Sequence, residues 1–409
     1  MYKRQEQVED QLQIALTIVD PTNGYVVAMI GGAGEKVVDR GWNWAVNARQ
    51  CGSAIKPVST YAPALDNGTI NGASVIDDYP MLLNGEVWPR NANWRYQGLT
   101  ALHTAIAQSL NTCAVRTNLA YGVSNSYDFL VDKLGFENLT YTDSQQVGNM
   151  ALGGFEKGVT TEEMSAAYAA FVNEGVYTKP RTFIRVEDAN GNVVLENEAQ
   201  STVAMKNTTA AIINHLLQEA ALNGTGYEAQ FSGMHIAGKT GSTNSNKDRY
   251  FVGYTPYYSC AVWAGYEHNQ RIVASGNPCS AVFRKVMSAI HADLADKDFF
   301  SCSGLTSVAV CADSGMLASE NCALDVRGSR VYTALVAADN APTAVCTMHT
   351  APTYTVNMAD SDGNVTTVTG SVLNYQRELI EGHDEIVVED AFMTVSYTHL
   401  RAHETAANL

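Results

Sequence analysis

The chain has 409 residues and carries 26 Lys and Arg against 42 Asp and Glu, so its formal net charge at pH 7 is −16. This length accommodates one large domain and a smaller one, each with its own hydrophobic core. The acidic balance, without a run of basic residues, argues against a nucleic-acid partner, because phosphate binding needs clustered Lys and Arg. No stretch reaches the roughly 18 apolar residues of a membrane span, and residues 1–13 lack the apolar segment of a signal peptide.

The predicted strands come from two separate parts of the chain. Residues 12–30 contain two runs rich in Ile and Val around a turn sequence, Asp-Pro-Thr-Asn-Gly, and predict a β-hairpin. Residues 234–267 predict three more strands, joined by short polar turns that permit only antiparallel pairing. Between them, residues 53 to about 177 are helical in pattern, and Thr160 with Glu163 forms a capping box.

A last amphipathic helix, over about residues 280–294, would pack on this sheet. Two early and three late strands predict an α+β fold: an antiparallel five-stranded sheet flanked by helices, with an all-helical insertion. We expect this domain to occupy residues 10–297. Residues 301–392 are rich in Thr, Val, Ala and Ser and contain cysteines, and they predict a small β-rich C-terminal extension of unknown role.

Ser53 and Lys56 begin a helical run that follows Cys51 and Gly52. Three residues apart on a helix, a hydroxyl and an amine lie on one face and can form a hydrogen bond. The positive end of a helix favours both a developing alkoxide and a neutral lysine, so the pair can act as nucleophile and base. Because Ser-x-x-Lys arises about once by chance in a chain of this length, it establishes no function alone.

Ser109 and Asn111 lie between two predicted helical stretches, where a bend would direct a hydroxyl and an amide into a cleft. The Ser-x-Asn spacing also occurs at three other serines. Alone, these two residues are explained as ordinary helix caps.

Lys239, Thr240 and Gly241 lie in a predicted strand and precede Ser242. A strand that binds a peptide alongside it needs a cation, hydroxyl groups for a carboxylate, and a glycine that lets the ligand backbone approach. This segment supplies all three, and it is the most specific of the motifs.

In this order, Ser-x-x-Lys, Ser-x-Asn and Lys-Thr-Gly resemble the motifs of the transpeptidase domain of class A penicillin-binding proteins, the bifunctional peptidoglycan synthases. The resemblance covers residues 12 to about 295. Further segments that share it are Arg49-Gln50, Trp88-Pro89-Arg90-Asn91, Ala151-Leu152-Gly153-Gly154, Gly224-Thr225-Gly226 and Asp248 to Pro256. The sequence departs from the family at Cys51 (usually proline), Ile55 (commonly aromatic) and Ser242 (usually threonine).

The resemblance implies a penicillin-binding, β-lactamase-like serine transferase fold and a role for each motif residue. Ser53 would attack the carbonyl between the two terminal D-alanines of a stem peptide, and Lys56 would accept its proton. Ser109 would pass a proton to the leaving D-alanine, Asn111 would orient Lys56 and the donor amide, and Lys239 would support the proton relay. We expect these five side chains to converge in one cleft.

The substrate would lie along the strand that contains the third motif. The hydroxyl groups of Thr240 and Ser242 would bind the terminal carboxylate, and Gly241 would admit the backbone of the ligand. The backbone N–H groups of Ser53 and Ser242 would form an oxyanion hole. An amine from a neighbouring stem peptide would then resolve the acyl-enzyme and form the cross-link.

The resemblance also implies partners and location. Peptidoglycan stem peptides and β-lactam antibiotics are the expected ligands, without a cofactor. The expected location is the extracytoplasmic face of the bacterial plasma membrane, with contact to the membrane only through an N-terminal anchor that this chain lacks, as it lacks the glycosyltransferase domain. Residues 1–5 and 395–409 resemble translated adapter sequence and are expected to be non-native, so His399 and His403 receive no role.

Three other functions are possible on the same scaffold. A β-lactamase needs an added carboxylate to activate the deacylating water. Glu156 lies in a Gly-rich turn, without an asparagine at the spacing that such enzymes show. Glu162 and Glu163 lie at the predicted helix start, where the capping box explains Glu163. A D,D-carboxypeptidase would use water as the acceptor, and a non-catalytic penicillin sensor would carry a transmembrane relay.

The cysteines leave a second question open. Their clustering towards the C-terminus favours disulfides or free thiols, since most of the intervals match no common zinc module. The alternative is a zinc site of Cys311, Cys322, Cys346 and His349, because Cys346-Thr-Met-His349 has a ligand-like spacing. Because disulfides or free thiols are favoured over this zinc site, we expect no metal. The eight cysteines are Cys51, Cys113, Cys260, Cys279, Cys302, Cys311, Cys322 and Cys346.

Overall fold

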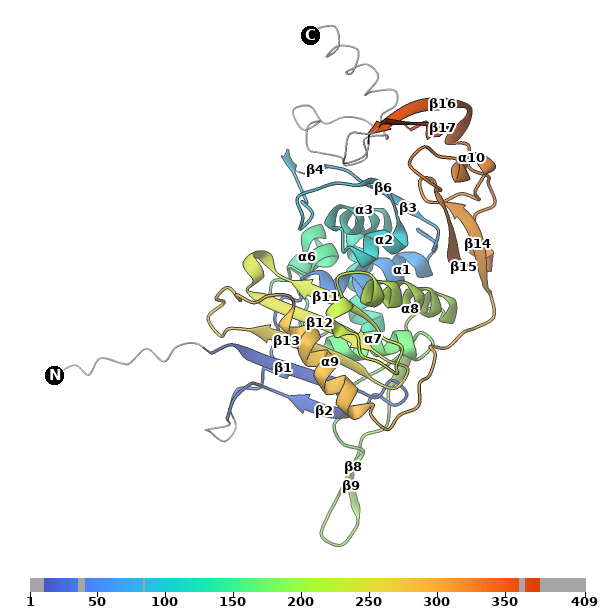
Figure 1. The fold of residues 1–409 in the computed structure, drawn as a ribbon. Helices are drawn as coiled ribbons and strands as arrows, with labels where there is room; N and C mark the ends of the chain where they lie inside the picture. The colour runs from blue at the N-terminus through green and yellow to red at the C-terminus, as the bar shows by residue number, and fades with distance from the viewer. Residues whose placement is uncertain (1–10, 36–40, 84, 360–364, 376–409) are drawn as a thin grey trace, which may run out of the picture. The chain divides into compact units, whose positions relative to one another are not determined.

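The computed structural model describes residues 11–35, 41–83, 85–359 and 365–375. The chain divides into two compact units, coloured along the sequence in Figure 1. The first unit is Met1–Asp66 with Asn118–Cys302, and the second is Asn67–Thr117 with Ser303–Leu409. The predicted non-native ends lie outside the described residues.

A five-stranded antiparallel sheet forms the centre of the first unit, in the order β11-β12-β13-β1-β2. The early hairpin and the three late strands therefore join in one sheet, as predicted. Between the first two strands, Asp20 accepts hydrogen bonds from the Thr22 N–H and the Asn23 side chain, which shape the predicted turn. The strands are β1 (Gln13–Val19), β2 (Val26–Ile30), β11 (Ala237–Ser242), β12 (Asp248–Tyr254) and β13 (Ser259–Gly265).

The helices of this unit include the predicted C-terminal one, α9. They are α1 (Ala62–Asp66), α4 (Val123–Asp128), α5 (Tyr141–Ser144), α6 (Val147–Leu152), α7 (Thr161–Val172), α8 (Asn207–Leu222) and α9 (Pro278–Ile290). Helix α7 begins at the predicted capping box, in which Glu163 Oε2 accepts the Thr160 N–H at 2.7 Å and Thr160 Oγ1 accepts the Glu163 N–H at 3.0 Å.

Helices cover both faces of the sheet. Because side chains alternate along a strand, Phe251 and Tyr254 of β12 point to opposite faces. The Phe251 ring contacts Phe283 of α9, with centroids 4.8 Å apart. The Tyr254 ring contacts Tyr168 of α7, with centroids 6.2 Å apart. The sheet is thus the middle of three layers.

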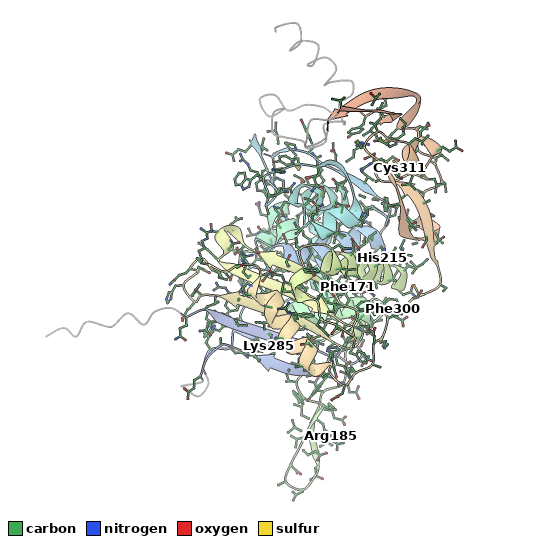
Figure 2. The ribbon with its side chains drawn as sticks, viewed as in Figure 1. Phe171, Arg185, His215, Lys285, Phe300 and Cys311 are labelled. Atoms are coloured by element: carbon green, nitrogen blue, oxygen red, sulfur yellow. The ribbon has the colours of Figure 1, made fainter. Side chains whose placement is uncertain are left out.

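The stretch predicted as helical, residues 53 to about 177, also contains strands, because β3 (Val75–Asp78) pairs with β6 (Gly98–Ala101) and β4 (Leu82–Leu83) pairs with β5 (Glu86–Val87). Further short strands follow it. Strands β7 (Val176–Thr178) and β10 (Ser201–Val203) form one small sheet, and β8 (Arg185–Glu187) with β9 (Val193–Glu196) forms another. Arg185 marks the β8–β9 hairpin, which projects from the rest of its unit (Figure 2).

The second unit combines residues from the middle and the end of the chain, so its limits differ from the expected boundary near residue 300. Its elements from the middle are β3 (Val75–Asp78), β4 (Leu82–Leu83), β5 (Glu86–Val87), β6 (Gly98–Ala101), α2 (Leu102–Ala107) and the start of α3 (Asn111–Tyr121). Its later elements are β14 (Leu305–Cys311), α10 (Glu320–Ala323), β15 (Val331–Ala337), β16 (His349–Ala359) and β17 (Val365–Leu373).

Contacts around Ala73 explain why these two stretches belong together. Ala73 is fully buried with Val310, Ala334 and Val336 of the β14–β15 hairpin. A Cβ atom on Gly72 would overlap the carbonyl oxygen of Leu335, so the chain approaches this hairpin closely only because residue 72 is glycine. The C-terminal extension is β-rich, as predicted, and it packs against residues near 73. Among the described residues, no helix combines the length and hydrophobicity required to span a bilayer.

Candidate active site

Ser53 lies in a short 3₁₀ turn, Gly52–Ile55, at the start of the predicted helical run. The Lys56 N–H donates to the Ser53 carbonyl, and a π-helical turn (Pro57–Tyr61) and α1 follow. Pro57 is the first residue of that turn, where its missing N–H removes no hydrogen bond. Lys56 is fully buried, whereas Ser53 is half-buried. The run is helical, as predicted, but in three short segments.

Strand β11 passes directly beside the Ser53 turn. A Cβ atom on Gly241 would overlap the Cys51 carbonyl oxygen and lie 2.9 Å from the Ala54 Cβ. Gly52 adopts φ +55°, and a Cβ there would overlap the Ser242 carbonyl. We expected Gly241 to admit the ligand backbone. In this structure the space is filled by the protein's own Cys51, and the two glycines let the turn and the strand meet.

Two hydrogen bonds from side chains outside the three motifs hold the Ser53 turn in place. The Tyr168 hydroxyl of α7 donates to the Ala54 carbonyl at 2.6 Å, and Gln50 Nε2 donates to the Phe155 carbonyl at 2.8 Å. Gly153, at φ +72°, also approaches the backbone of Gly52, where a Cβ would overlap it. No sequence motif marks Tyr168. The resemblance of residues 151–154 to the family was the available indication for Gly153.

An ion pair fixes the residues that precede Ser53. Arg49 Nε lies 2.8 Å from Asp248 Oδ1, and Trp263 Nε1 donates to the same oxygen at 3.0 Å. The Arg49 guanidinium also lies over the Trp263 ring, 5.2 Å from its centroid. Both partners are mostly buried, so this pair fixes geometry more than it adds stability.

Lys239 is the second buried lysine of this unit, on β11. Its Nζ donates to the Thr240 carbonyl at 3.2 Å. Burial disfavours the ammonium and lowers the pKa of Lys239 to about 7. At neutral pH its amine is therefore divided between the charged and neutral forms, and it can give or take a proton.

The two hydroxyl groups expected to bind a carboxylate each have a partner. Thr240 Oγ1 donates to Thr225 Oγ1 at 2.8 Å, and Ser242 Oγ accepts from Arg249 Nη1 at 2.9 Å. Arg249 is the residue that pairs with Ser242 in the antiparallel register. None of the three motifs includes this arginine, although it lies within the family-like segment that begins at Asp248.

Ser109 and Asn111 lie in the second unit, at the junction of α2 and α3. Ser109 adopts φ +59°, which produces the predicted bend between the helices. The Asn111 N–H donates to Asn91 Oδ1 at 2.7 Å, and its side chain donates to the Arg90 carbonyl at 2.8 Å. Asn91 in turn donates to Asp78 at 2.7 Å. Residues 90 and 91 thus brace the Ser-x-Asn turn.

The structure brings Ser53, Lys56 and Lys239 together in one unit and places Ser109 and Asn111 in the other. The convergence of all five side chains in one cleft stays a prediction.

The carboxylates that a β-lactamase would need have other partners. Both oxygens of Glu163 accept hydrogen bonds: Oε2 from the N–H and hydroxyl of Thr160, and Oε1 from the Glu137 N–H and Asn138 Nδ2. Glu156 accepts from the Thr140 hydroxyl at 2.7 Å. Burial raises the pKa of Glu162, the residue before Glu163.

The cysteines are free thiols, one of the two states that the cysteine prediction favoured. All eight cysteines lie within the described residues, and none forms a disulfide. Burial raises the pKa of the Cys51 thiol, so this cysteine beside Ser53 is disfavoured as a thiolate. In the second unit, Cys311, Cys322, Cys346 and His349 instead gather their ligand atoms within 4.8 Å of one another.

Two models of known protein families match this chain. Residues 14–288 match the family model for the penicillin-binding protein transpeptidase domain, and residues 301–351 match the model for the C-terminal domain of penicillin-binding protein 1A. This chain belongs to the penicillin-binding protein transpeptidase family. The family named from the motifs is therefore confirmed.

Similar proteins include a curated relative and two solved structures. Penicillin-binding protein 1A of Clostridium perfringens is 35% identical over 370 residues, which are 87% of this chain and 44% of the relative. The chain thus spans less than half the length of that protein. Penicillin-binding protein 1A from Haemophilus influenzae has a TM-score of 0.68 at 22% identity, covering 82% of this chain and 54% of that one. The PonA1 protein from Mycobacterium tuberculosis in complex with penicillin V has a TM-score of 0.61 at 24% identity, covering 74% and 83%. These likenesses confirm the predicted fold.

Proposed function

We propose that this chain is a serine D,D-transpeptidase that cross-links peptidoglycan stem peptides at the extracytoplasmic face of the plasma membrane, and that β-lactams acylate the same serine. The observation that supports it most is the packing of the Ser53 turn against β11. Gly52 and Gly241 allow this approach, and two buried lysines lie on the same two segments. Membership of the transpeptidase family supports the same activity.

Acylation begins at Ser53. Its hydroxyl proton passes to the neutral amine of Lys56 as Oγ attacks the carbonyl carbon between the two D-alanines. The backbone N–H groups of Ser53 and Ser242 stabilise the resulting oxyanion, each by about 3 kcal/mol. The peptide C–N bond then breaks, and D-alanine leaves with a proton delivered through Ser109. The ester on Ser53 is finally attacked by the amine of a second stem peptide.

Lys239 supports proton transfer in this scheme. A lysine whose pKa lies near 7 can exchange a proton with neighbouring groups without a large energetic cost. Asn111, held by Arg90 and Asn91, would orient Lys56 and the donor amide.

Recognition of the terminal carboxylate would fall to the exposed edge of β11. Thr240 and Ser242 supply hydroxyl groups, and Arg249 adds a cation that already contacts the Ser242 hydroxyl. A β-lactam carboxylate carries the same charge and would use the same groups. The PonA1 structure with penicillin V shows such a ligand on a protein of this fold.

Mass spectrometry after incubation with penicillin tests the proposal. We expect one adduct per chain, located on Ser53 by peptide mapping. Ser53→Ala should abolish it, and Ser288→Ala on α9 should retain it. An adduct on another residue, or none in the folded wild-type chain, would contradict the proposal. Synthetic stem peptide with an added amine then distinguishes cross-linking from hydrolysis, the outcome expected of a D,D-carboxypeptidase.

A further inference from the structure

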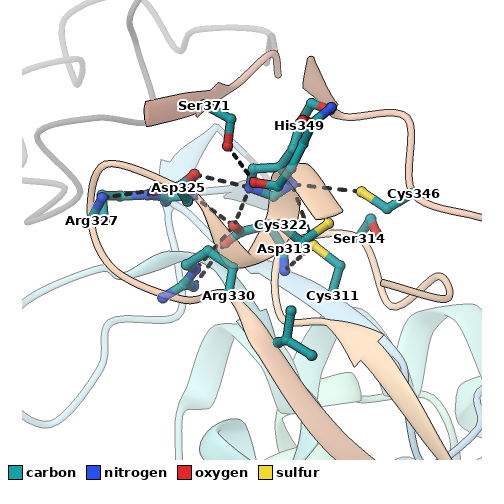
Figure 3. Close-up of polar contacts among 12 residues, drawn as sticks. Cys311, Asp313, Ser314, Cys322, Asp325, Arg327, Arg330, Cys346, His349 and Ser371 are labelled. Carbon is teal, nitrogen blue, oxygen red and sulfur yellow. Dashed lines mark hydrogen bonds and ion pairs between the residues drawn. The ribbon is translucent and has the colours of Figure 1, made fainter. Parts of the chain in front are cut away.

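Four metal-binding side chains meet in the second unit, outside the site described above. They come from three places: Cys311 ends β14, Cys322 lies in α10, and Cys346 and His349 flank the start of β16. Figure 3 shows the three sulfur atoms gathered around one edge of the imidazole. All four side chains are buried, with at most 4% of any of them exposed. Their ligand atoms all lie within 4.8 Å of one another.

The spacing of these atoms suits a tetrahedral ion. His349 Nδ1 lies 3.5 Å from Cys311 Sγ and 3.6 Å from Cys346 Sγ. With Zn–S near 2.3 Å and Zn–N near 2.0–2.1 Å, two ligand atoms at tetrahedral angles lie about 3.5 Å apart. These two nitrogen–sulfur separations therefore match edges of a zinc coordination sphere, whereas a disulfide would require two of the sulfurs to be bonded at about 2.05 Å.

The other nitrogen of the imidazole supplies an independent indication. His349 Nε2 lies 3.0 Å from Asp325 Oδ2 and 3.2 Å from Asp313 Oδ2. A zinc-binding histidine almost always directs its second nitrogen at a carboxylate or carbonyl, which fixes the tautomer and the ring orientation. With the ring proton on Nε2, this contact would leave Nδ1 facing the sulfurs as the ligand atom.

The two aspartates are held as supports, not as ligands. Asp313 contacts Arg330 at 2.8 Å and Arg327 at 2.6 Å, and Arg327 also contacts Asp325 at 2.8 Å. Their charges are thus balanced by guanidinium groups. A metal bound by Asp313, Asp325 and His349 would have to displace these arginines.

Backbone groups donate to two of the sulfurs. The Asp313 N–H contacts Cys311 Sγ at 3.4 Å, and the Ser319 N–H contacts Cys322 Sγ at 3.4 Å. Such donors stabilise a thiolate, which is the form that binds a metal. A purely apolar cysteine core would need neither these donors nor an imidazole nitrogen at its centre.

We propose that this unit binds one Zn²⁺ through Cys311, Cys322, Cys346 and the Nδ1 atom of His349. Three cysteines and one histidine form a closed tetrahedral set, typical of structural zinc. On binding, each thiol that is still protonated releases one proton. The ion joins the end of β14, α10 and the start of β16, which otherwise share a small core. This proposal departs from the prediction that no metal binds.

The test uses the full chain, purified without chelator from zinc-supplemented cells. We expect elemental analysis to give about one zinc per chain, and cobalt substitution to give the absorption of a tetrahedral cobalt-thiolate centre. Cys346→Ser and His349→Ala should lose the metal, whereas Cys302→Ser, a matched change outside the cluster, should keep it.

A measurement on the wild-type chain covers the case in which these variants fail to fold. Adding a strong chelator should make three further thiols reactive towards a thiol reagent and lower the melting temperature. Several results would overturn the proposal: a folded chain that binds no zinc, a different metal in its place, a disulfide between any two of the three cysteines, or loss of zinc in Cys302→Ser.

Discussion

Lys56 is fully buried beside Ser53, and its proposed role as base can be separated from its charge. Lys56→Arg keeps the cation and most of the side-chain length, but a guanidinium does not deprotonate near neutral pH. We expect acylation by penicillin to fall by at least about 10²-fold, the usual contribution of a general base, with the fold retained. Stopped-flow acylation rates and melting temperatures check this, with Lys247→Arg, an exposed lysine, as control. Acylation of Lys56→Arg at nearly the wild-type rate would assign the base to another residue.

Lys239 should destabilise the folded chain in a pH-dependent way. Its pKa in the folded state, about 7, lies below the ordinary value of 10.5. Below pH 7 the amine is charged in both states, so burying the ammonium reduces the free energy of unfolding by its full amount. Between pH 7 and 10.5 only the unfolded chain keeps the proton, so this destabilisation becomes smaller as the pH rises. Lys239→Met should therefore raise the melting temperature most at pH 6 to 7, and less as the pH approaches 10.

The size of this effect follows from the shift, which corresponds to a few kcal/mol. The same substitution should lower the acylation rate, because it removes the proton relay, so stability and activity would change in opposite directions. A melting temperature that is unchanged at all pH values would show that the Lys239 ammonium is solvated.

At the scale of elements, the approach of β11 to the Ser53 turn depends on glycine. Gly241→Ala would place a Cβ on the Cys51 carbonyl and Ala54 and push the strand away. A displacement of about 1 Å in a catalytic geometry costs about 10²-fold in rate. We expect a loss of this order in acylation with a smaller change in melting temperature. Gly154→Ala is the control, since its Cβ would lie 3.7 Å from Asn149 Oδ1, an ordinary contact.

A substitution in the cap of α7 tests the transpeptidase hypothesis against the β-lactamase hypothesis. Both oxygens of Glu163 accept hydrogen bonds, and a Gln amide offers only one acceptor oxygen. Glu163→Gln should therefore reduce stability by about 1 kcal/mol and leave the penicillin adduct on Ser53 as long-lived as in the wild type. Intact-mass time courses measure that lifetime, which we expect to be many minutes. Rapid wild-type hydrolysis of a chromogenic cephalosporin that disappears in Glu163→Gln would favour a β-lactamase.

Asp325 offers a graded test of the zinc proposal. Asp325→Asn keeps the shape of the side chain but removes the carboxylate that orients His349. Loss of such a support lowers metal affinity about 10- to 100-fold. Competition with a chromogenic zinc chelator measures the change, and Asp339→Asn, outside the cluster, serves as control. Equal affinities in both variants would contradict an orienting role for Asp325.

Across the whole molecule, the features that could be predicted from the sequence are those that depend on residues close together in the chain. The capping box at Thr160 and the hairpin around Asp20 each depend on groups within a few positions, so local patterns were sufficient. The contact of Tyr168 with Ala54 joins residues 114 apart, and no local pattern marks it. The family resemblance singled out residues 88–91, but no local pattern predicted the hydrogen bond from Asn111 to the Arg90 carbonyl.

The cysteines illustrate why spacing alone was insufficient. The intervals from 311 to 322 and from 322 to 346 follow no common zinc module, because these ligands come from separate turns that only the folded chain brings together, and the ligand-like spacing of Cys346 and His349 was insufficient alone. The grouping of residues 67–117 with the C-terminal region was unpredicted for the same reason. It depends on the buried contact of Ala73 with a hairpin more than 200 positions later.

The order of strands in the central sheet has a consequence for biosynthesis. Val19 of β1 pairs with Ser259 of β13, about 240 residues later. At about 5–20 residues per second, the ribosome needs roughly 12 to 48 s to make the intervening chain. Throughout that interval the inner edge of β1 lacks its neighbour, and Leu16 and Ile18 lack the helix that covers them. The nascent chain should therefore depend on a chaperone that shields the early hairpin until the last three strands emerge.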